Sequence, residues 1–355
     1  MSTVNRVLAA VLLSIGLTPA AAASAARPAQ PLVDLPPQST GFADHVGAVR
    51  ATPRAVGNSP AQAYMSPDGQ SVKVRFSRSY EPDPAVAQSY VDFLGGLAHG
   101  SELAKLKIDI ATPSEVQSRC GGVEGTLACY DPYSSRMTVP GEQTDAGEGV
   151  TTSYVIAHEY GHHIARYRDN RPFLALNFGP KRWASYEQVC LNAIRGRLAP
   201  GDEGENYLAN PGEAWADAFA HLKYPDVPWQ FIPLLKPGKK AKAAALLDIG
   251  EPWTKPVVET FSGRFKPGGP RTVTHEIELT LDGSLRVAID GPKGANFDIG
   301  LSSLGRDEGG SKGPTADDVY RVKYACREVA SERVQITIER VSGYGAYTAT
   351  VSYAG

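Results

Sequence analysis

Hydrophobic residues recur at helical intervals over much of the first part of the chain, between shorter apolar runs. Residues 83–98 (DPAVAQSYVDFLGGLA) open with Asp and Pro, which favour the first turn of a helix. Residues 210–222 open in the same way, with Asn and Pro. A third helix is predicted at 183–199, and strands are predicted at 72–77, 106–112 and 136–140. This order predicts a small mixed sheet with helices.

Past residue 270 the period changes to two, which is typical of half-buried strands. Residues 277–281 (IELTL) and 285–289 (LRVAI) alternate on either side of Asp282 and Gly283, a pair that favours a tight turn. The pattern predicts a β-hairpin.

The change of period divides the chain of 355 residues into two folded domains, as its length also suggests. We expect residues 66–262 to form an α+β domain. The alternation recurs at 334–338 and 347–353, so 270–355 should form a small all-β sandwich, with the boundary near 261–271. Residues 27–65 are rich in Pro and Ala and lack periodicity through residue 60, which indicates a poorly ordered linker or pro-segment.

The first 26 residues have the organisation of a secretory signal peptide. Arg6 precedes an apolar run at 7–17 and small residues at 18–26, so we expect cleavage within 20–26. The apolar run is too short to cross a bilayer, and no other segment approaches the required length. The mature protein is therefore expected to be secreted, extracellular and monomeric.

Charge and cysteine content narrow the partners and the compartment. The formal net charge is −2 and there is no long basic run, which argues against nucleic acid as a partner. The four cysteines fit an oxidising compartment and have no C-x-x-C spacing. Cys120 and Cys129 bracket a small glycine-rich loop, so we favour a 120–129 disulfide. For Cys190 and Cys326 we favour a second disulfide that joins the two halves of the chain, with two buried thiols as the alternative.

The candidate chemistry lies in residues 154–167 (YVIAHEYGHHIARY), an apolar helical run that contains three histidines and a glutamate. His158 and His162 are four residues apart and share one helix face, so both can reach one zinc ion, with Glu159 beside the open position. H-E-x-x-H on a helix is the signature of zinc metallopeptidases. His163 points about 100° away from His162 and is expected to be a flanking polar residue.

A catalytic zinc usually has three protein ligands and a water. No third histidine follows in the pattern H-E-x-x-H-x-x-G-x-x-H, so the third ligand must come from farther along the chain. Glu213 and Asp217 lie four apart on a mostly apolar predicted helix, although Glu213 could instead form a capping box with Asn210. The candidates are Glu203, Glu205, Glu213, Asp217 and His221.

The segments HEYGHH and EAWAD together resemble the gluzincin pattern, and in particular the bacterial neutral zinc metallopeptidases with HExxHH and a downstream ExxAD helix. The resemblance covers roughly residues 105–222, including CYDPYSSRMTVP at 129–140. It implies a zincin-like fold and zinc bound by His158, His162 and Glu213, with Asp217 holding a ligand histidine. The 51 positions from His162 to Glu213 exceed the gap in thermolysin-like enzymes, so details of their substrate cleft do not transfer.

The C-terminal part resembles the bacterial pre-peptidase C-terminal domain, through NFDIGL at 296–301 and GYGAYTATVSY at 343–353. We expect it to be a separable accessory domain that attaches to substrates or surfaces. The acidic loop 306–318 is a candidate calcium site in this domain.

These features predict a secreted zinc endopeptidase that hydrolyses proteins or peptides with a zinc-activated water and Glu159 as general base. Tyr207 and His221 are candidates for stabilising the transition state. An extended substrate could pair with a strand near 136–140. Two alternatives stay open, namely a zinc-stabilised binding protein with a vestigial active site and a zinc amidase acting on cell-wall peptides.

Overall fold

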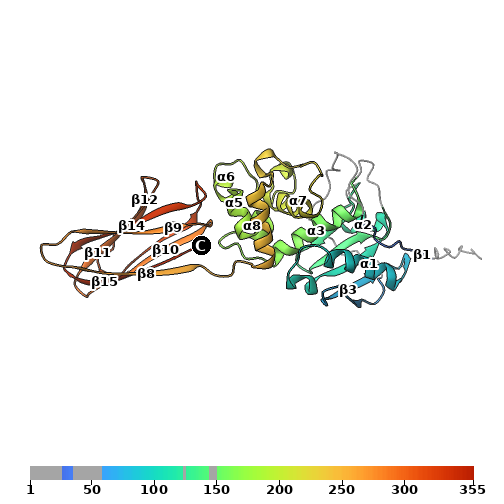
Figure 1. Cartoon of the computed structure of the whole chain (residues 1–355), viewed down its shortest axis with the longest axis horizontal. Coiled ribbons are helices and arrows are strands. Elements are labelled where there is room, and N and C mark those ends of the chain that lie inside the picture. The colour runs from blue at the N-terminus through green and yellow to red at the C-terminus, as the bar shows by residue number, and fades with distance from the viewer. Residues whose placement is uncertain (1–25, 35–57, 123–124, 144–149) are drawn as a thin grey trace, which may run out of the picture.

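The computed structural model describes residues 26–34, 58–122, 125–143 and 150–355. The predicted signal peptide, apart from residue 26, lies outside the described residues, as do residues 35–57 of the predicted linker. Two domains lie end to end along the long axis of the molecule, an N-terminal domain of mixed helices and strands and a C-terminal domain of strands (Figure 1).

A five-stranded mixed sheet forms one part of the N-terminal domain. Its order is β2 (Gln62–Met65), β3 (Ser71–Phe76), β5 (Lys107–Ala111), β7 (Arg136–Pro140) and β6 (Cys129–Asp131). The three central strands are parallel, and each edge strand is antiparallel to its neighbour. The mixed sheet expected from the sequence is confirmed. A short parallel pair, β1 (Arg27–Pro28) and β4 (Tyr80–Glu81), lies outside this sheet.

The predicted helix starts are present. Helix α1 (Pro84–Gly95) begins after Asp83, whose carboxylate accepts hydrogen bonds from two backbone N–H groups. Helix α3 (Thr152–Arg166) carries the histidines, and α7 (Pro211–Lys223) begins after Asn210, whose side chain accepts from Gly212 N. The remaining helices are α2 (Pro113–Arg119), α4 (Ala175–Phe178), α8 (Lys239–Gly250), and the short 3-10 helices η1 (Ser101–Lys105), η2 (Tyr207–Ala209) and η3 (Pro233–Leu235).

The single helix predicted at 183–199 is wrong. The chain forms two short helices there, α5 (Lys181–Tyr186) and α6 (Val189–Ile194). Gln188 between them has φ +52°, a left-handed conformation that interrupts a right-handed helix. Its side chain donates to Glu328 O of the C-terminal domain at 3.0 Å, so the break is tied to the contact between domains.

The expectation of poor order also fails at both ends of residues 27–65. At the first end, Ala29 and Leu32 are buried in the N-terminal core, and Leu32 N donates to Ser89 Oγ at 2.8 Å. At the other end, β2 is an edge strand of the mixed sheet. Composition alone did not reveal the two apolar side chains that fix the first stretch or the strand pairing that fixes the second.

The C-terminal domain is a sandwich of two four-stranded sheets, compatible with the β-sandwich expected. One sheet has the order β13-β10-β15-β8 and the other β12-β11-β14-β9. Side chains that alternate along the strands meet in one apolar core between the sheets. The strands are β8 (Val257–Phe265), β9 (Thr272–Leu279), β10 (Gly283–Asp290), β11 (Asn296–Ser303), β12 (Arg306–Ser311), β13 (Asp318–Ala325), β14 (Glu332–Ser342) and β15 (Gly345–Tyr353).

Two sequence-based details of the sandwich need correction. Strand β8 pairs along its whole length with β15, so the sandwich begins at Val257 and not at residue 270. The predicted hairpin across Asp282 does not form, because β9 and β10 belong to different sheets. Asp282 is buried against the N-terminal domain, where its backbone N–H donates to Ser185 Oγ at 2.8 Å. The chain therefore crosses from one sheet to the other there.

The two domains are joined by a disulfide and by buried polar contacts. Both favoured cysteine pairs are present, Cys120–Cys129 within the N-terminal domain and Cys190–Cys326 between the domains. The Lys181 ammonium donates to Asp282 O at 2.9 Å across the junction, and Arg327 donates to Ser185 O at 2.7 Å. The C-terminus lies near this junction in Figure 1, where Ala354 packs with Trp253 and Leu281.

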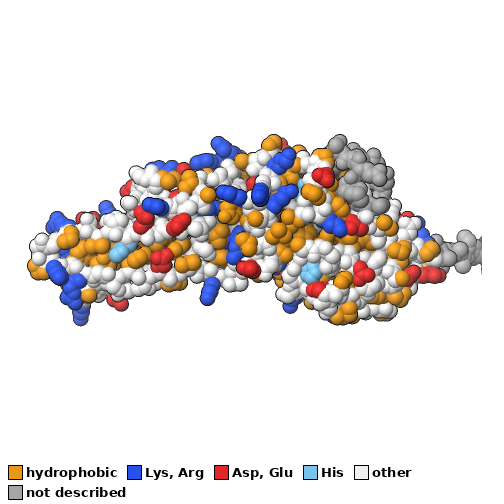
Figure 2. All heavy atoms as spheres, in the orientation of Figure 1, with side chains coloured by type: hydrophobic (Ala, Val, Ile, Leu, Met, Phe, Trp, Pro, Cys, Tyr) orange, Lys and Arg blue, Asp and Glu red, His pale blue; other side chains and the backbone are white. Residues whose placement is uncertain are grey.

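No helix in the described part of the chain is long and apolar enough to cross a membrane. On the face drawn in Figure 2, acidic and basic side chains are both present on each domain, and hydrophobic side chains lie between them.

Candidate metal centre

Helix α3 is buried on all sides although it carries several ionisable side chains. Every residue from 152 to 165 is buried, including Glu159 and the three histidines. Buried ionisable groups are costly unless they are paired or bind an ion. The partners of each side chain therefore show which of them could serve a metal.

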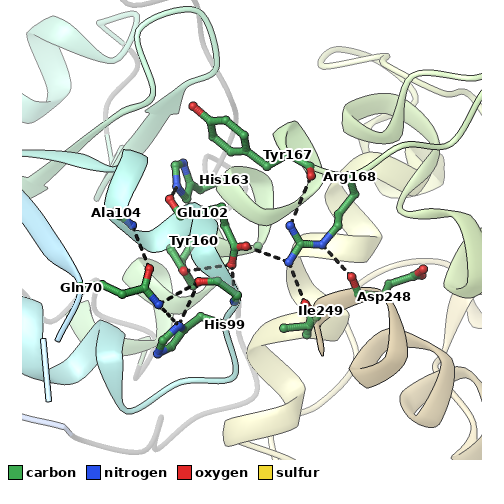
Figure 3. A network of polar contacts seen from close by, with 12 residues as sticks. Gln70, His99, Glu102, Ala104, Tyr160, His163, Tyr167, Arg168, Asp248 and Ile249 are labelled. Atoms are coloured by element: carbon green, nitrogen blue, oxygen red, sulfur yellow. Dashed lines mark hydrogen bonds and ion pairs between the residues drawn. The ribbon is translucent and has the colours of Figure 1, made fainter. Parts of the chain in front are cut away.

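One side of α3 is occupied by protein contacts. His163 places Nδ1 2.9 Å from the Tyr130 hydroxyl and Nε2 2.8 Å from Glu102 O, and burial lowers its pKa to about 4. Figure 3 shows Glu102 between Tyr160 of α3 and Arg168, whose guanidinium donates to the Glu102 carboxylate at 2.8 Å. His163 thus contacts a carbonyl and belongs to this network.

The other side of α3 holds the histidines of the HExxH segment. His158 Nε2 lies 3.3 Å from Glu213 Oε2, and His162 Nε2 lies 3.3 Å from Glu213 Oε1. One potential ligand atom from each of the three residues lies within 4.8 Å of the others. In the described part of the chain this is the one group of three or more His, Cys, Asp or Glu residues close enough to hold an ion.

The charges in this group support one another. Burial by itself lowers the pKa of His158, but the Asp217 and Glu213 carboxylates raise it to about 10. Burial by itself raises the pKa of Glu213, yet His162 and His158 hold it well below its usual range. In the protein alone, the ligand atoms of the three residues are thus paired as a buried carboxylate between two imidazoles.

Helices α3 and α7 approach closely enough for this contact because of Gly161. A Cβ atom at this position would lie 2.7 Å from Ala216 Cα on α7, closer than real side chains allow. The Trp215 indole N–H donates to Gly161 O at 2.9 Å and holds the two helices together. The glycine inside HEYGHH therefore brings Glu213 to the histidines.

Asp217 lies behind His158, as the resemblance implied. Its Oδ1 atom is 3.8 Å from His158 Nδ1 and accepts a 2.5 Å hydrogen bond from the Tyr154 hydroxyl. His221 does not face the three-residue group, because its ring nitrogens lie 2.9 Å from Asp217 O and 2.8 Å from Val227 O. The prediction that His221 stabilises a transition state is therefore wrong on geometric grounds.

Tyr207 of η2 does reach the three-residue group. Its hydroxyl donates to Glu213 Oε2 at 3.0 Å. Burial and the Glu213 carboxylate raise the pKa of this phenol well above its usual value, so it stays a donor. Glu213 itself does not form the capping box with Asn210, because its carboxylate is directed to the histidines.

Glu159 is the side chain of α3 whose carboxylate lacks a protein partner. Both oxygens are buried, and neither makes a hydrogen bond of normal geometry with the described residues. Burial raises the pKa of Glu159 to about 7, although the neighbouring histidines and the backbone of Tyr130 on β6 lower it. A buried, unpaired carboxylate beside two imidazoles is suited to accept a proton.

A cavity of about 920 Å³ opens beside His162 and Glu213. Its walls include Tyr133 after β6, Arg166 at the end of α3, and Glu203. Part of Glu203 faces solvent, and its carboxylate accepts a hydrogen bond from Asn210 Nδ2 at 3.1 Å. Partial desolvation of this carboxylate raises its pKa to about 7, helped by the nearby Glu213. Glu205 is exposed too and does not line the cavity.

Arg166 and the wall formed by residues 173–177 were not predicted from the sequence. Arg166 is four residues after His162, so the helical period that relates the two histidines also places Arg166 on their face. No comparable signal identifies residues 173–177, whose position depends on how the loop after α3 folds back.

The strand expected to pair with an extended substrate is also corrected. Strand β7, at 136–140, has β5 on one side and β6 on the other, so both of its edges are occupied. Strand β6 is instead an edge strand of the sheet that the described residues form, and its last residue, Asp131, lines the cavity.

In the C-terminal domain, Asp318 is the buried carboxylate beside the predicted calcium loop. It accepts hydrogen bonds from Ser311 Oγ at 2.5 Å and from the backbone N–H groups of Gly313 and Val319. No group of three His, Cys, Asp or Glu ligands lies there among the described residues. A calcium ion in this loop stays a prediction.

Comparison with known proteins gives little further guidance. No family model matches the chain, and no curated protein matches it. A solved pre-peptidase C-terminal domain of a collagenase from Bacillus anthracis is similar over 26% of this chain and 87% of its own length, with 12% identity and a TM-score of 0.21.

Two structures from infectious bursal disease virus are also similar. The VP2 subviral particle matches over 28% of this chain and 33% of its own chain, with 15% identity and a TM-score of 0.17. The Gx strain matches over 29% and 34%, with 15% identity and a TM-score of 0.15. Scores this low establish neither a fold family nor a function.

Proposed function

We propose that this chain is a secreted zinc-dependent endopeptidase with a zincin-like catalytic domain. The observation that carries the proposal is the position of Glu213. A carboxylate from a helix 51 positions downstream lies 3.3 Å from an Nε2 atom of each HExxH histidine, beside an unpaired buried glutamate and a cavity.

The donor atoms fit zinc in a catalytic setting. Two imidazole nitrogens and one carboxylate are the ligand set of many hydrolytic zinc enzymes, which leave one position for water. A structural zinc site would be closed by a fourth protein ligand, and the described residues place none within this group. His158, His162 and Glu213 would hold the ion, which when bound supplies Lewis acidity and a water of lowered pKa.

The neighbouring residues then have separate roles. Asp217, 3.8 Å from His158 Nδ1, keeps that imidazole oriented so that Nε2 faces the ion. Glu159 takes a proton from the attacking water and returns it to the leaving amine. Tyr207, whose hydroxyl is already at Glu213, donates to the oxygen of the scissile carbonyl as negative charge develops.

The cleft also favours a polypeptide substrate. Among the described residues, strand β6 pairs on one side only, and it ends at the cavity that contains His162 and Glu213. An extended peptide can add to such an edge by main-chain hydrogen bonds, which requires no particular side chain. Two disulfides suit an extracellular setting.

The test is the substitution Glu159→Gln in the full chain. Wild-type protein should bind one zinc and digest casein in a manner that a chelator abolishes. The variant should retain zinc, because Glu159 is not a ligand, and lose nearly all hydrolysis, because the amide cannot accept the proton. Zinc content by elemental analysis and casein digestion are the two readouts.

The same experiment distinguishes the alternatives. A variant that cleaves casein at close to the wild-type rate would refute the general-base role. Wild-type protein that binds zinc and cleaves nothing would indicate a binding protein. Cleavage of cell-wall peptides without cleavage of casein would indicate an amidase.

A further inference from the structure

A second hollow continues the cleft toward the C-terminal domain. It has a volume of about 400 Å³ and shares Phe173, Leu174 and Asn177 with the cavity beside the candidate metal ligands. Its far wall includes Ile194 of α6 and Tyr324 of β13. The sandwich therefore contributes a side chain to a groove that begins at His162.

The groove is apolar at this end. Leu174 is 69% exposed, Ile194 is 65% exposed and Tyr324 is 44% exposed, although all three are large hydrophobic residues. Among the described residues that line the second hollow, Asn177 is the most polar and none is charged. Exposed apolar surface in a concave site is typical of a place where a partner binds.

Stacked aromatic rings line this part of the groove. The Phe173 ring lies 4.7 Å from Phe178 and 5.4 Å from Tyr324, with interplanar angles of 26° and 20°. Phe173 belongs to the N-terminal domain and Tyr324 to the sandwich. Because these two rings stack on each other, the aromatic surface is continuous across the junction between the domains.

The position of Tyr324 is fixed by the junction. Cys326, two residues after Tyr324, forms the disulfide with Cys190 of the N-terminal domain. Nearby, the Gln188 side chain donates to Glu328 O at 3.0 Å. The groove is therefore present before any ligand binds, which reduces the entropy cost of binding.

We propose that this groove binds a large apolar side chain of an extended polypeptide substrate, several residues away from the bond that is cleaved. The inference rests on the proposed peptidase function. Continuity with the cleft indicates the occupant, because a chain bound along β6 and past His162 would continue over Phe173 to Tyr324. The sandwich would then select long substrates with an aromatic or aliphatic anchor.

The experiment measures binding, so it does not depend on hydrolysis. A fluorescent peptide of about twelve residues, long enough to span a cleft at about 3.3 Å per residue, carries Phe near both ends. It is titrated into the full-length Glu159→Gln protein with zinc present. A matched peptide carries Ser in place of each Phe. We expect the Phe peptide to bind more tightly than the Ser peptide.

Substitutions in the groove should remove this preference. Tyr324→Ala should weaken binding of the Phe peptide about five- to tenfold, the usual range for an aromatic contact. Ile194→Asp, at the other exposed residue of that wall, should weaken it by a similar factor. Tyr344→Ala is the matched control, because Tyr344 is a 47% exposed tyrosine of the sandwich that lines neither hollow. Thermal melts of all variants verify folding.

Equal binding by the Tyr324, Ile194 and Tyr344 variants would overturn the groove, whether or not the protein is a peptidase. Wild-type protein that cleaves no peptide, while its binding still depends on Tyr324 and Ile194, would refute the peptidase function and leave the groove as a peptide-binding site.

Discussion

The core of the sandwich and the interface between helices α3 and α7 bury different kinds of side chain. Inward positions of the sandwich strands are mostly apolar, as in β14, where Val334, Ile336 and Ile338 face the core. The N-terminal domain has an apolar core of its own, but between α3 and α7 it also buries the two histidines of the HExxH segment, Glu159, Glu213 and Asp217, each at most 2% exposed. Replacing buried ion pairs by apolar residues is often neutral or stabilising, so stability alone does not explain these charges. The difference is the one expected if the sandwich core serves folding and the α3–α7 interior holds the proposed zinc ion.

The largest expected effect comes from removing a ligand. Glu213→Gln removes the charge while preserving the size of the side chain and an oxygen that can accept from the Tyr207 hydroxyl. As a ligand, its loss should weaken zinc binding by more than the ten- to a hundredfold that losing a partner of a ligand typically causes. Zinc affinity is measured by competition with a chelator.

Two further variants calibrate this result. Asp217→Asn should weaken zinc binding by about ten- to a hundredfold, because it only weakens the hold on His158. Glu205→Gln, at an exposed position of the same acidic loop as Glu203, should not change it. Normal zinc affinity in the Glu213→Gln protein would mean that the ligand is elsewhere.

The next substitution tests the apolar core of the sandwich. Ile336 is fully buried in β14, so Ile336→Ala should destabilise the sandwich by about 2–5 kcal/mol through lost burial and a cavity. Hydrogen exchange of the amides in β14 measures the loss. Val319→Ala, at a 44% exposed position of β13, is the control and should change exchange little. If the sandwich core contributes to folding and not to the metal site, zinc content stays normal in both Ile336→Ala and Val319→Ala. A loss of zinc in Ile336→Ala would show that the site depends on the sandwich core.

A smaller effect is expected from Gly161→Ala, which tests how closely the two helices must pack. The new methyl group would meet Ala216 Cα at 2.7 Å, so α7 must shift, at a cost of about 1–3 kcal/mol in unfolding free energy. The shift moves Glu213 away from the histidines and should lower zinc affinity as well. Gly250→Ala, in α8 with open space around it, should be neutral or stabilising. Unchanged zinc affinity in Gly161→Ala would show that the helices tolerate separation.

The sequence predicted local features of the site better than the loops around it. His158 and His162 are related by one helical turn, and Glu213 follows a readable helix start, so spacing and a motif were enough to propose the group. The prediction for His221 failed because the sequence indicated that it lies on α7 but not which way its side chain points. Residues 173–177 line the cleft because of the path of the loop after α3, which no periodic pattern in the sequence predicts.

In the sandwich, alternation predicted which side chains face inward but not which strands pair. Residues 277–281 and 285–289 alternate as a hairpin would, yet Asp282 is held at the domain junction and the strands part into two sheets. The boundary was misplaced for a similar reason, because β8 is half-exposed and shows little alternation in hydrophobicity. A truncation near residue 265, which the predicted boundary suggests, would leave β8 without its partner β15.

The smallest effect is expected at the junction between the N-terminal domain and the sandwich. Lys181 is fully buried, and its ammonium donates to Arg171 O at 2.7 Å and to Asp282 O at 2.9 Å. Burial lowers its pKa to about 8, against an ordinary value of 10.5, with Asp282 offsetting part of the effect.

Above pH 8 the folded chain has released this proton while the unfolded chain still binds it, so stability should rise with pH until the unfolded lysine also titrates. The rise should not exceed about 1.4 kcal/mol per pH unit. It is measured by denaturant unfolding between pH 7.5 and about 9, where few unfolded tyrosines are ionised. Lys181→Met should remove the rise, and Lys240→Met, at an exposed lysine of α8, should keep it. A rise that persists in Lys181→Met would assign it to another group and would mean that Lys181 stays charged in the folded junction.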